Sequence, residues 1–140
     1  MGLAAALTAA VAGMDSEALR LAALRNAFEA GLLARVPGVR INGAGTARGE
    51  RLPTASSVTF PGADGETLLA ALDLEGVAAS SGSACASGTP SPSRVLLACG
   101  MPAAEVRGTL RFSFGWTSSE ADVAALLEIL PGLVARARAV

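Results

Sequence analysis

The chain has 140 residues, about the size of one globular domain, and 51% of them are hydrophobic, which is enough for a single core. Its 11 basic and 12 acidic residues are spread along the sequence and give a net charge of -1, so we expect no nucleic-acid partner. Two cysteines cannot form a disulfide framework, and without histidine a closed zinc site would lack ligands, so we expect no metal and a reducing, cytoplasmic setting.

The N-terminal segment is mostly apolar and uncharged over Met1 to Met14. It lacks the positive flank of a secretory signal and is too short to span a bilayer, so we expect no membrane association. Its alanine-rich part predicts a short helix over Leu3–Ala12. Gly13 then predicts a stop, and Asp15 or Ser16 a new N-cap.

A second helix follows, with an apolar stripe that ends before Pro37-Gly38; the stripe consists of Leu21, Leu24, Phe28 and Leu32. Val39–Ile41 predicts a short strand, and the glycine-rich residues 42–55 predict a surface loop. A strand over Ser57–Phe60 is expected next.

Asp64 predicts the N-cap of a helix over Glu66–Leu72, and Val77–Ser80 predicts a buried strand that leads into a cysteine-containing loop. Pro92, behind Ser91, predicts the first turn of a helix over Ser93–Cys99.

The next strand, Thr109–Phe114, alternates in polarity, so Leu110, Phe112 and Phe114 should share one face and Thr109, Arg111 and Ser113 the other. Thr117 and Glu120 form a capping-box pattern for a last helix, which Pro131-Gly132 should kink or break. The predicted fold class is α+β: one domain over residues 1–140, with a small, mainly antiparallel sheet covered on one side by helices.

The candidate nucleophile is Cys85, which lies within nine small residues from Ser80 to Gly88. Such a segment predicts a flexible loop whose thiol stays accessible and can be supported as a thiolate. The alternative is that Cys85 packs as a small residue in a tight turn. Cys99 lies on an apolar helix and is expected to be buried and structural.

Arg111 is the candidate ligand-binding residue, because a planar guanidinium can hold a carboxylate with two parallel hydrogen bonds. The alternative is a solvated or salt-bridged surface arginine. All 11 basic residues are arginines, and the chain has neither histidine nor tyrosine. It therefore cannot form a Schiff base with pyridoxal phosphate through a lysine, and its chemistry must use Cys85, Arg111 or groups from elsewhere.

Two segments carry a resemblance to a known family. Ser80-Ser81-Gly82-Ser83-Ala84-Cys85 resembles the active-site loop of the group I cysteine desulfurases, and Arg111-Phe112-Ser113 with Gly115 resembles their substrate-arginine strand. These are fold-type I pyridoxal-phosphate enzymes of the class V aminotransferase superfamily. The likeness continues upstream through Asn42-Gly43 and Gly65-Glu66, so it covers essentially the whole chain.

The resemblance implies that the chain is the C-terminal small domain of such an enzyme. The Cys85 thiolate would attack the sulfur of L-cysteine, giving L-alanine and a persulfide, while Arg111 holds the substrate carboxylate. The persulfide sulfur would pass to a scaffold or acceptor protein for iron-sulfur cluster or thiolation pathways. The groups that hold pyridoxal phosphate would lie in a domain absent here, through which the parent would form a homodimer.

Two other readings stay open at the level of sequence. The chain could be a stand-alone persulfide-relay or interaction domain, or the small domain of another class V aminotransferase in which Cys85 is incidental. On every reading the chain alone is expected to bind no cofactor and to be inactive, because it offers no lysine for pyridoxal phosphate.

Overall fold

The computed structural model describes residues 2–45, 51–81 and 92–139. The elements it describes follow one another in the order α1 (Gly2–Arg35), β1 (Arg40–Ile41), β2 (Ala55–Thr59), α2 (Gly65–Leu74), β3 (Ser80–Ser81), α3 (Arg94–Ala98), α4 (Ala103–Arg107), β4 (Thr109–Ser113) and α5 (Glu120–Ala137).

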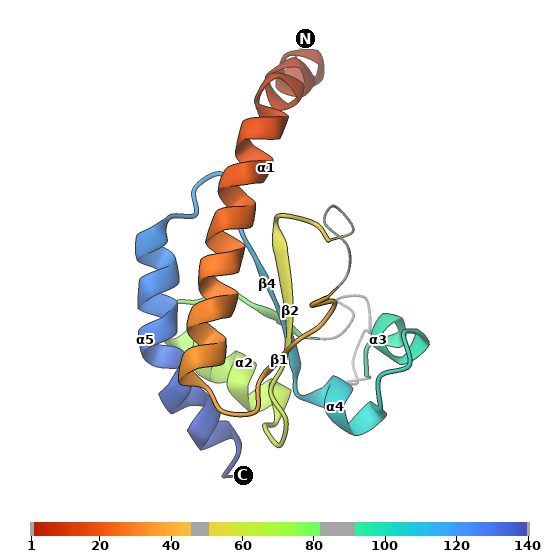
Figure 1. The fold of residues 1–140 in the computed structure, drawn as a ribbon, viewed down its shortest axis with the longest axis vertical. Coiled ribbons are helices and arrows are strands. Elements are labelled where there is room, and N and C mark those ends of the chain that lie inside the picture. Colours follow the sequence, from red (N-terminus) through yellow and green to blue (C-terminus); the bar gives the residue numbers. More distant parts are fainter. Residues whose placement is uncertain (1, 46–50, 82–91, 140) are drawn as a thin grey trace.

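The strands form one sheet in the order β1-β2-β4-β3, and every neighbouring pair is antiparallel. Helices α1, α2 and α5 cover one face of the sheet, while α3 and α4 lie on the other side of the molecule (Figure 1). The predicted fold class, a small antiparallel sheet with helices on one side, is therefore confirmed.

The core lies between the sheet and the three covering helices. The apolar stripe of α1 is buried as expected, and the Phe28 ring lies 5.0 Å from that of Phe112 on β4. Gly31 lets α5 approach closely, because a Cβ atom at this position would lie 2.4 Å from a methyl carbon of Leu127. Packing against α5 and the sheet thus fixes the C-terminal half of α1.

The N-terminal region is one helix and not two, so the predicted break at Gly13 is wrong. The backbone of Gly13 does not take the left-handed conformation of a C-terminal cap. The Ser16 hydroxyl donates to the Gly13 carbonyl at 3.0 Å and therefore does not cap a new helix. A single glycine costs a helix about 1 kcal/mol relative to alanine, which is not enough to end it.

The first turns of α1 extend beyond the body of the molecule (Figure 1). Leu3, Leu7, Val11 and Met14 are all at least 60% exposed, so this part of the helix carries apolar side chains without packing them. Within the described ranges, no helix is both long enough and apolar enough to cross a membrane.

The cap of α2 is confirmed and that of α5 is displaced. The Asp64 side chain accepts from the Thr67 backbone N–H at 2.8 Å, as predicted. The capping box of α5 consists of Ser119 and Asp122, not Thr117 and Glu120. Thr117 and Ser119 offer the same chemistry, so the pattern alone could not choose between them.

Helix α5 also runs through Pro131, although Pro131-Gly132 predicted a kink or break. Proline removes the N–H that would normally bond the carbonyl four residues earlier, which here belongs to Leu127. The Arg35 guanidinium donates to that carbonyl at 3.2 Å. A side chain from α1 therefore replaces the missing backbone donor and keeps the helix continuous.

The predicted buried strand Val77–Ser80 is also wrong. Strand β3 comprises only Ser80 and Ser81, Val77 is half-buried, and Ala78 is exposed. Among the described strands β3 pairs only with β4, at the edge of the sheet, where burial is incomplete. At α3 the N-cap is Ser93, so Pro92 precedes the helix and does not form its predicted first turn.

Candidate functional site

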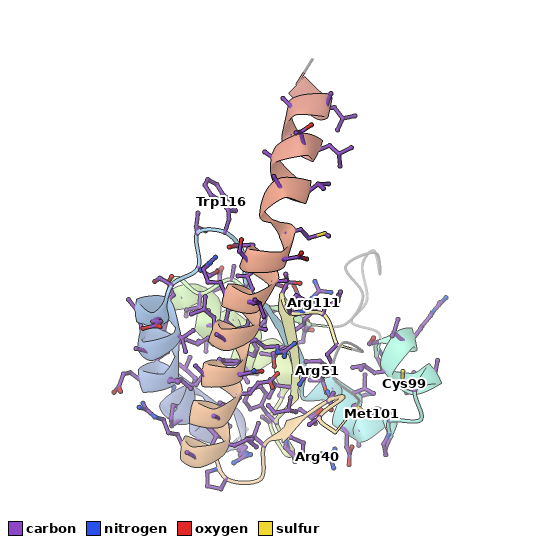
Figure 2. All side chains as sticks on the ribbon, turned by 45° about the horizontal axis from the view of Figure 1, so that its top comes forward. Arg40, Arg51, Cys99, Met101, Arg111 and Trp116 are labelled. Carbon is purple, nitrogen blue, oxygen red and sulfur yellow. The ribbon has the colours of Figure 1, made fainter. Side chains whose placement is uncertain are left out.

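Arg111 lies in the middle of β4 on the sheet face that α1, α2 and α5 do not cover (Figure 2). Its side chain is exposed, as the alternation of the strand predicted, whereas Leu110 and Phe112 are buried against the helices. In the register of the sheet it stands between Ser57 of β2 and Ser80 of β3. Its Nη2 lies 3.5 Å from the Ser80 Oγ.

Arg111 also lacks an acidic partner among the described residues. The ion pairs there join Arg20 to Glu17, Arg35 to Glu128, Arg40 to Glu105 and Arg51 to Glu29. The salt-bridged alternative for Arg111 therefore has no support in this part of the chain. An exposed guanidinium without a carboxylate can accept one from a ligand.

The remaining predicted site residues divide into two groups. Ser80 and Ser81 form β3, and the Ser81 hydroxyl donates to Glu66 of α2 at 3.0 Å. Cys85, with Gly82, Ser83 and Ala84, lies outside the described residues. In the sequence this segment follows directly after Ser80 and Ser81, the residues that pair with Arg111 and Leu110.

The second cysteine differs from expectation. Cys99 is exposed, although its apolar surroundings in the sequence predicted burial. It caps the five-residue α3, which has no buried residue and lies apart from the covering helices (Figure 2). Leu96, Leu97 and Ala98 are apolar but do not reach the core, and so the sequence was misleading here.

Sequence reasoning missed a group of polar residues beside Arg111. Asn42 Nδ2 lies 3.0 Å from both the Ser57 Oγ and the Thr59 Oγ1, and the Thr59 Oγ1 lies 2.9 Å from the Thr109 Oγ1. Ser57 and Thr59 alternate with the buried Val58, which is the signal that could have placed them on the face of Arg111. Thr59 and Thr109 are buried, so the hydrogen bond between them is shielded from water, whereas those of Asn42 are only partly buried.

Two kinds of cofactor attachment find no suitable group of residues here. Within the part of the chain that the structure describes, no three histidine, cysteine or acidic side chains group as metal ligands. The sequence has no lysine, so its residues do not fit the covalent attachment of pyridoxal phosphate. What the site offers is a free guanidinium with hydroxyl groups around it, an arrangement suited to a carboxylate.

Comparison with known proteins places these features in a family. The model of the aminotransferase class-V family matches residues 1–126. The chain is 47% identical to the IscS-like cysteine desulfurase of Mycobacterium tuberculosis, over 99% of this chain and 35% of that protein. It is 40% identical to the cysteine desulfurase IscS of Clostridium botulinum, over 99% of this chain and 34% of that protein.

Solved structures of NifS-like proteins have the same fold over most of this chain. A NifS-like protein from Rickettsia africae superposes with a TM-score of 0.73 at 25% identity, covering 86% of this chain and 30% of that one. Another NifS-like protein gives a TM-score of 0.78 at 26% identity, covering 96% of this chain and 33% of that one. The chain thus spans only about a third of the length of these relatives.

Proposed function

This chain belongs to the aminotransferase class-V family, and from that premise we propose that residues 1–140 form the C-terminal small domain of a cysteine desulfurase. The relatives it matches are named cysteine desulfurases and are about three times as long. The rest of their length would supply a larger, cofactor-binding domain. As a single domain, the chain would contribute the sulfur-accepting half of the active site.

Cys85 is the proposed sulfur acceptor. Its thiolate would attack the sulfur of L-cysteine, so that the carbon–sulfur bond breaks, the released carbon takes up a proton to give L-alanine, and the sulfur remains on Cys85 as a persulfide. A thiolate is the nucleophilic form of cysteine, and an accessible loop suits its transfer to a second protein. That partner would be a scaffold or acceptor protein of iron-sulfur cluster or thiolation pathways in the cytoplasm.

Arg111 is proposed to hold the carboxylate of the substrate. The observation that carries this function is the pairing of Arg111 with Ser80, because it puts a guanidinium that has no carboxylate partner in the described part of the chain at the start of the segment that contains Cys85. A carboxylate bound there would tether its amino acid beside that segment. Ser80 through Ala84 would form the loop that brings the thiol to the substrate, with Ser80 and Ser81 attaching it to the sheet as β3.

Pyridoxal phosphate would be held by the parent's other domain. When bound, it supplies the electron sink that activates the substrate. The present chain lacks a lysine and would bring only Cys85 and Arg111 to the reaction, so alone it should be inactive. Dimerisation of the parent would also use the other domain.

The test of Cys85 uses the longer polypeptide that contains this segment, with Cys85→Ala and Cys99→Ala as matched variants. Cys85→Ala should still bind L-cysteine but form almost no persulfide or alanine, because no second nucleophile is placed to attack the sulfur. Cys99→Ala should keep near-normal activity. Near-normal alanine formation by Cys85→Ala would remove Cys85 from the reaction and leave a different class V aminotransferase as the parent.

Arg111→Lys in the same polypeptide tests the carboxylate site. An ammonium group cannot form two parallel hydrogen bonds to a carboxylate, so kcat/KM for L-cysteine should fall about tenfold to a thousandfold. Steady-state kinetics give this ratio directly. Unchanged kinetics would assign Arg111 to the solvated surface instead.

A further inference from the structure

A row of polar side chains crosses the sheet at the level of Arg111. Ser57 and Ser80 are its direct neighbours in the register of β2, β4 and β3. Asn42 extends the row past β1, since its backbone N–H donates to the Ser57 carbonyl at 2.8 Å. Residues directly opposite one another in antiparallel strands place their side chains within contact distance on the same face.

The hydrogen bonds of this row have a direction that their distances favour. Thr109 Oγ1 has two acceptors within reach, the Glu105 carbonyl at 2.9 Å and the Met101 Sδ at 3.7 Å, and the nearer carbonyl oxygen is the stronger acceptor for its single hydrogen. Thr59 must then donate to Thr109 across their 2.9 Å contact. The Asn42 Oδ1, 3.1 Å away, is the other acceptor that Thr59 could reach; with its hydrogen given to Thr109, Thr59 accepts from the Asn42 Nδ2 at 3.0 Å.

The Asn42 side chain therefore points its NH₂ group toward Thr59 and donates one amide hydrogen to it. Its second amide hydrogen points to the Ser57 Oγ, 3.0 Å away. Ser57 thus accepts from Asn42, and its own hydroxyl hydrogen remains to be donated. In the described part of the chain no acceptor takes that hydrogen, and Ser57 is only half-buried, so a ligand on the open face can reach it.

We infer that Ser57 donates a hydrogen bond to the same carboxylate that Arg111 binds, and that Asn42 is the positioning residue that keeps the Ser57 hydroxyl a donor. This inference rests on the proposed function, which places a substrate carboxylate at Arg111. Ser57 and Ser80 differ in role: the Ser80 Oγ accepts from Arg111, whereas Ser57 does not. A guanidinium with one adjacent hydroxyl donor recognises a carboxylate by charge and by a third hydrogen bond.

The test is a titration of the 140-residue chain with L-alanine, the amino-acid product, followed by the NMR shifts of the backbone amides of β2, β3 and β4 in every variant and of the Arg111 side-chain Nε–H where it is present. Wild type, Ser57→Ala and Ser57→Thr are compared. Ser113→Ala serves as the matched control, because Ser113 is an exposed serine on the same strand and sheet face as Arg111 but lies outside the row. Arg111→Gln reports on the carboxylate site itself.

In Ser57→Ala the apparent Kd for L-alanine should rise roughly threefold to tenfold, since a hydrogen bond to a charged group is lost. Ser57→Thr keeps a hydroxyl and should bind within about twofold of wild type, as should Ser113→Ala. Backbone amide spectra that match wild type will show that each variant is folded. Asn42→Ala should weaken L-alanine binding as Ser57→Ala does, and the double variant should be no weaker than either.

Two results would contradict the inference in different ways. If Arg111 responds to L-alanine in wild type and Ser57→Ala binds equally tightly, the role of Ser57 is wrong and that of Arg111 stands. If L-alanine causes no shifts in wild type, or the same shifts in Arg111→Gln as in wild type, the carboxylate site of the proposed function is wrong. The inference then falls with it.

Discussion

The arginines of this chain differ in what their guanidinium groups contact. Arg20 donates to the Ser118 and Gly115 carbonyls at 2.7 and 3.1 Å and so fixes the turn after β4 against α1. Arg138 does the same for the Pro37 and Pro61 carbonyls at 2.9 and 3.0 Å. These arginines hold backbone turns in place, whereas the Arg111 guanidinium donates, among the described residues, only to the Ser80 hydroxyl.

Glu29 and Arg51 form the most buried of the described ion pairs, and breaking this pair should lower the free energy of unfolding. Their side chains are 11% and 21% exposed, and Glu29 also accepts from the buried Ser56 hydroxyl at 2.7 Å. Glu29→Ala would leave that hydroxyl and the guanidinium without their partner. We expect it to lower the free energy of unfolding by about 1–3 kcal/mol.

The control is Glu128→Ala. It breaks the ion pair of Glu128 with Arg35, in which the Glu128 side chain is 74% exposed. An exposed ion pair contributes about 0–1 kcal/mol, so this variant should differ little from wild type. Urea unfolding followed by circular dichroism measures both. Equal losses in the two variants would show that burial does not set the strength of the Glu29 pair.

At the scale of elements, the cap of α2 should make stability depend on pH. The Thr67 backbone N–H bonds the Asp64 carboxylate and lowers its pKa from the ordinary 3.8. A carboxyl group whose pKa is lower when folded stabilises the fold above the unfolded pKa, and this contribution is lost as the pH falls through the folded pKa. Asp64→Asn should therefore be less stable than wild type near pH 6, with the gap closing below pH 3.8. Urea midpoints at several pH values give the gap, and a constant gap would refute the role of the charge.

The continuity of α5 depends on a contact between helices, which a double-mutant cycle can measure. Arg35→Met removes the donor to the Leu127 carbonyl and should cost about 1 kcal/mol of unfolding free energy. In a Pro131→Ala background, the restored backbone N–H can bond that carbonyl, so the same change should cost less. The exposed pair with Glu128 is lost in both backgrounds and cancels. A cost that Pro131→Ala does not alter would mean that Arg35 does not replace the proline's missing donor.

Local rules predicted some elements of this chain and failed at others for a physical reason. Asp64 was predictable because one capping residue stands before one apolar helix. The breaks at Gly13 and Pro131 were wrong because helix-breaking costs of about 1 and 3 kcal/mol can be offset by other interactions, here for Pro131 by a guanidinium from α1 together with the burial of Leu130, Leu133 and Val134 around it. Such compensation comes from residues distant in sequence, which a local pattern does not contain.

At the scale of the whole molecule, alternation along β4 predicted which face Arg111 occupies, and the structure confirms it. The neighbours of Arg111 were not predictable in the same way, because Ser57 and Ser80 lie 54 and 31 positions away and meet it only through strand pairing. Cys99 shows the reverse error, in which an apolar stretch suggested a core that the fold places elsewhere. A polar face can therefore be predicted from one strand, but a binding site needs the register of several.

The protruding start of α1 has a thermal consequence. Its first twelve or so residues have alanine-rich helix propensity but little packing, and isolated helices of that length are marginal in water. On heating, we expect helical circular dichroism to fade gradually before the cooperative transition, and backbone amides before Met14 to exchange with deuterium far faster than those after Leu21. Hydrogen-exchange mass spectrometry resolves this gradient. Uniform protection along α1 would show that its exposed turns are held by more than their own helix propensity. The expected gradient would show that α1 is stable where it packs on the core and frays progressively toward its exposed end.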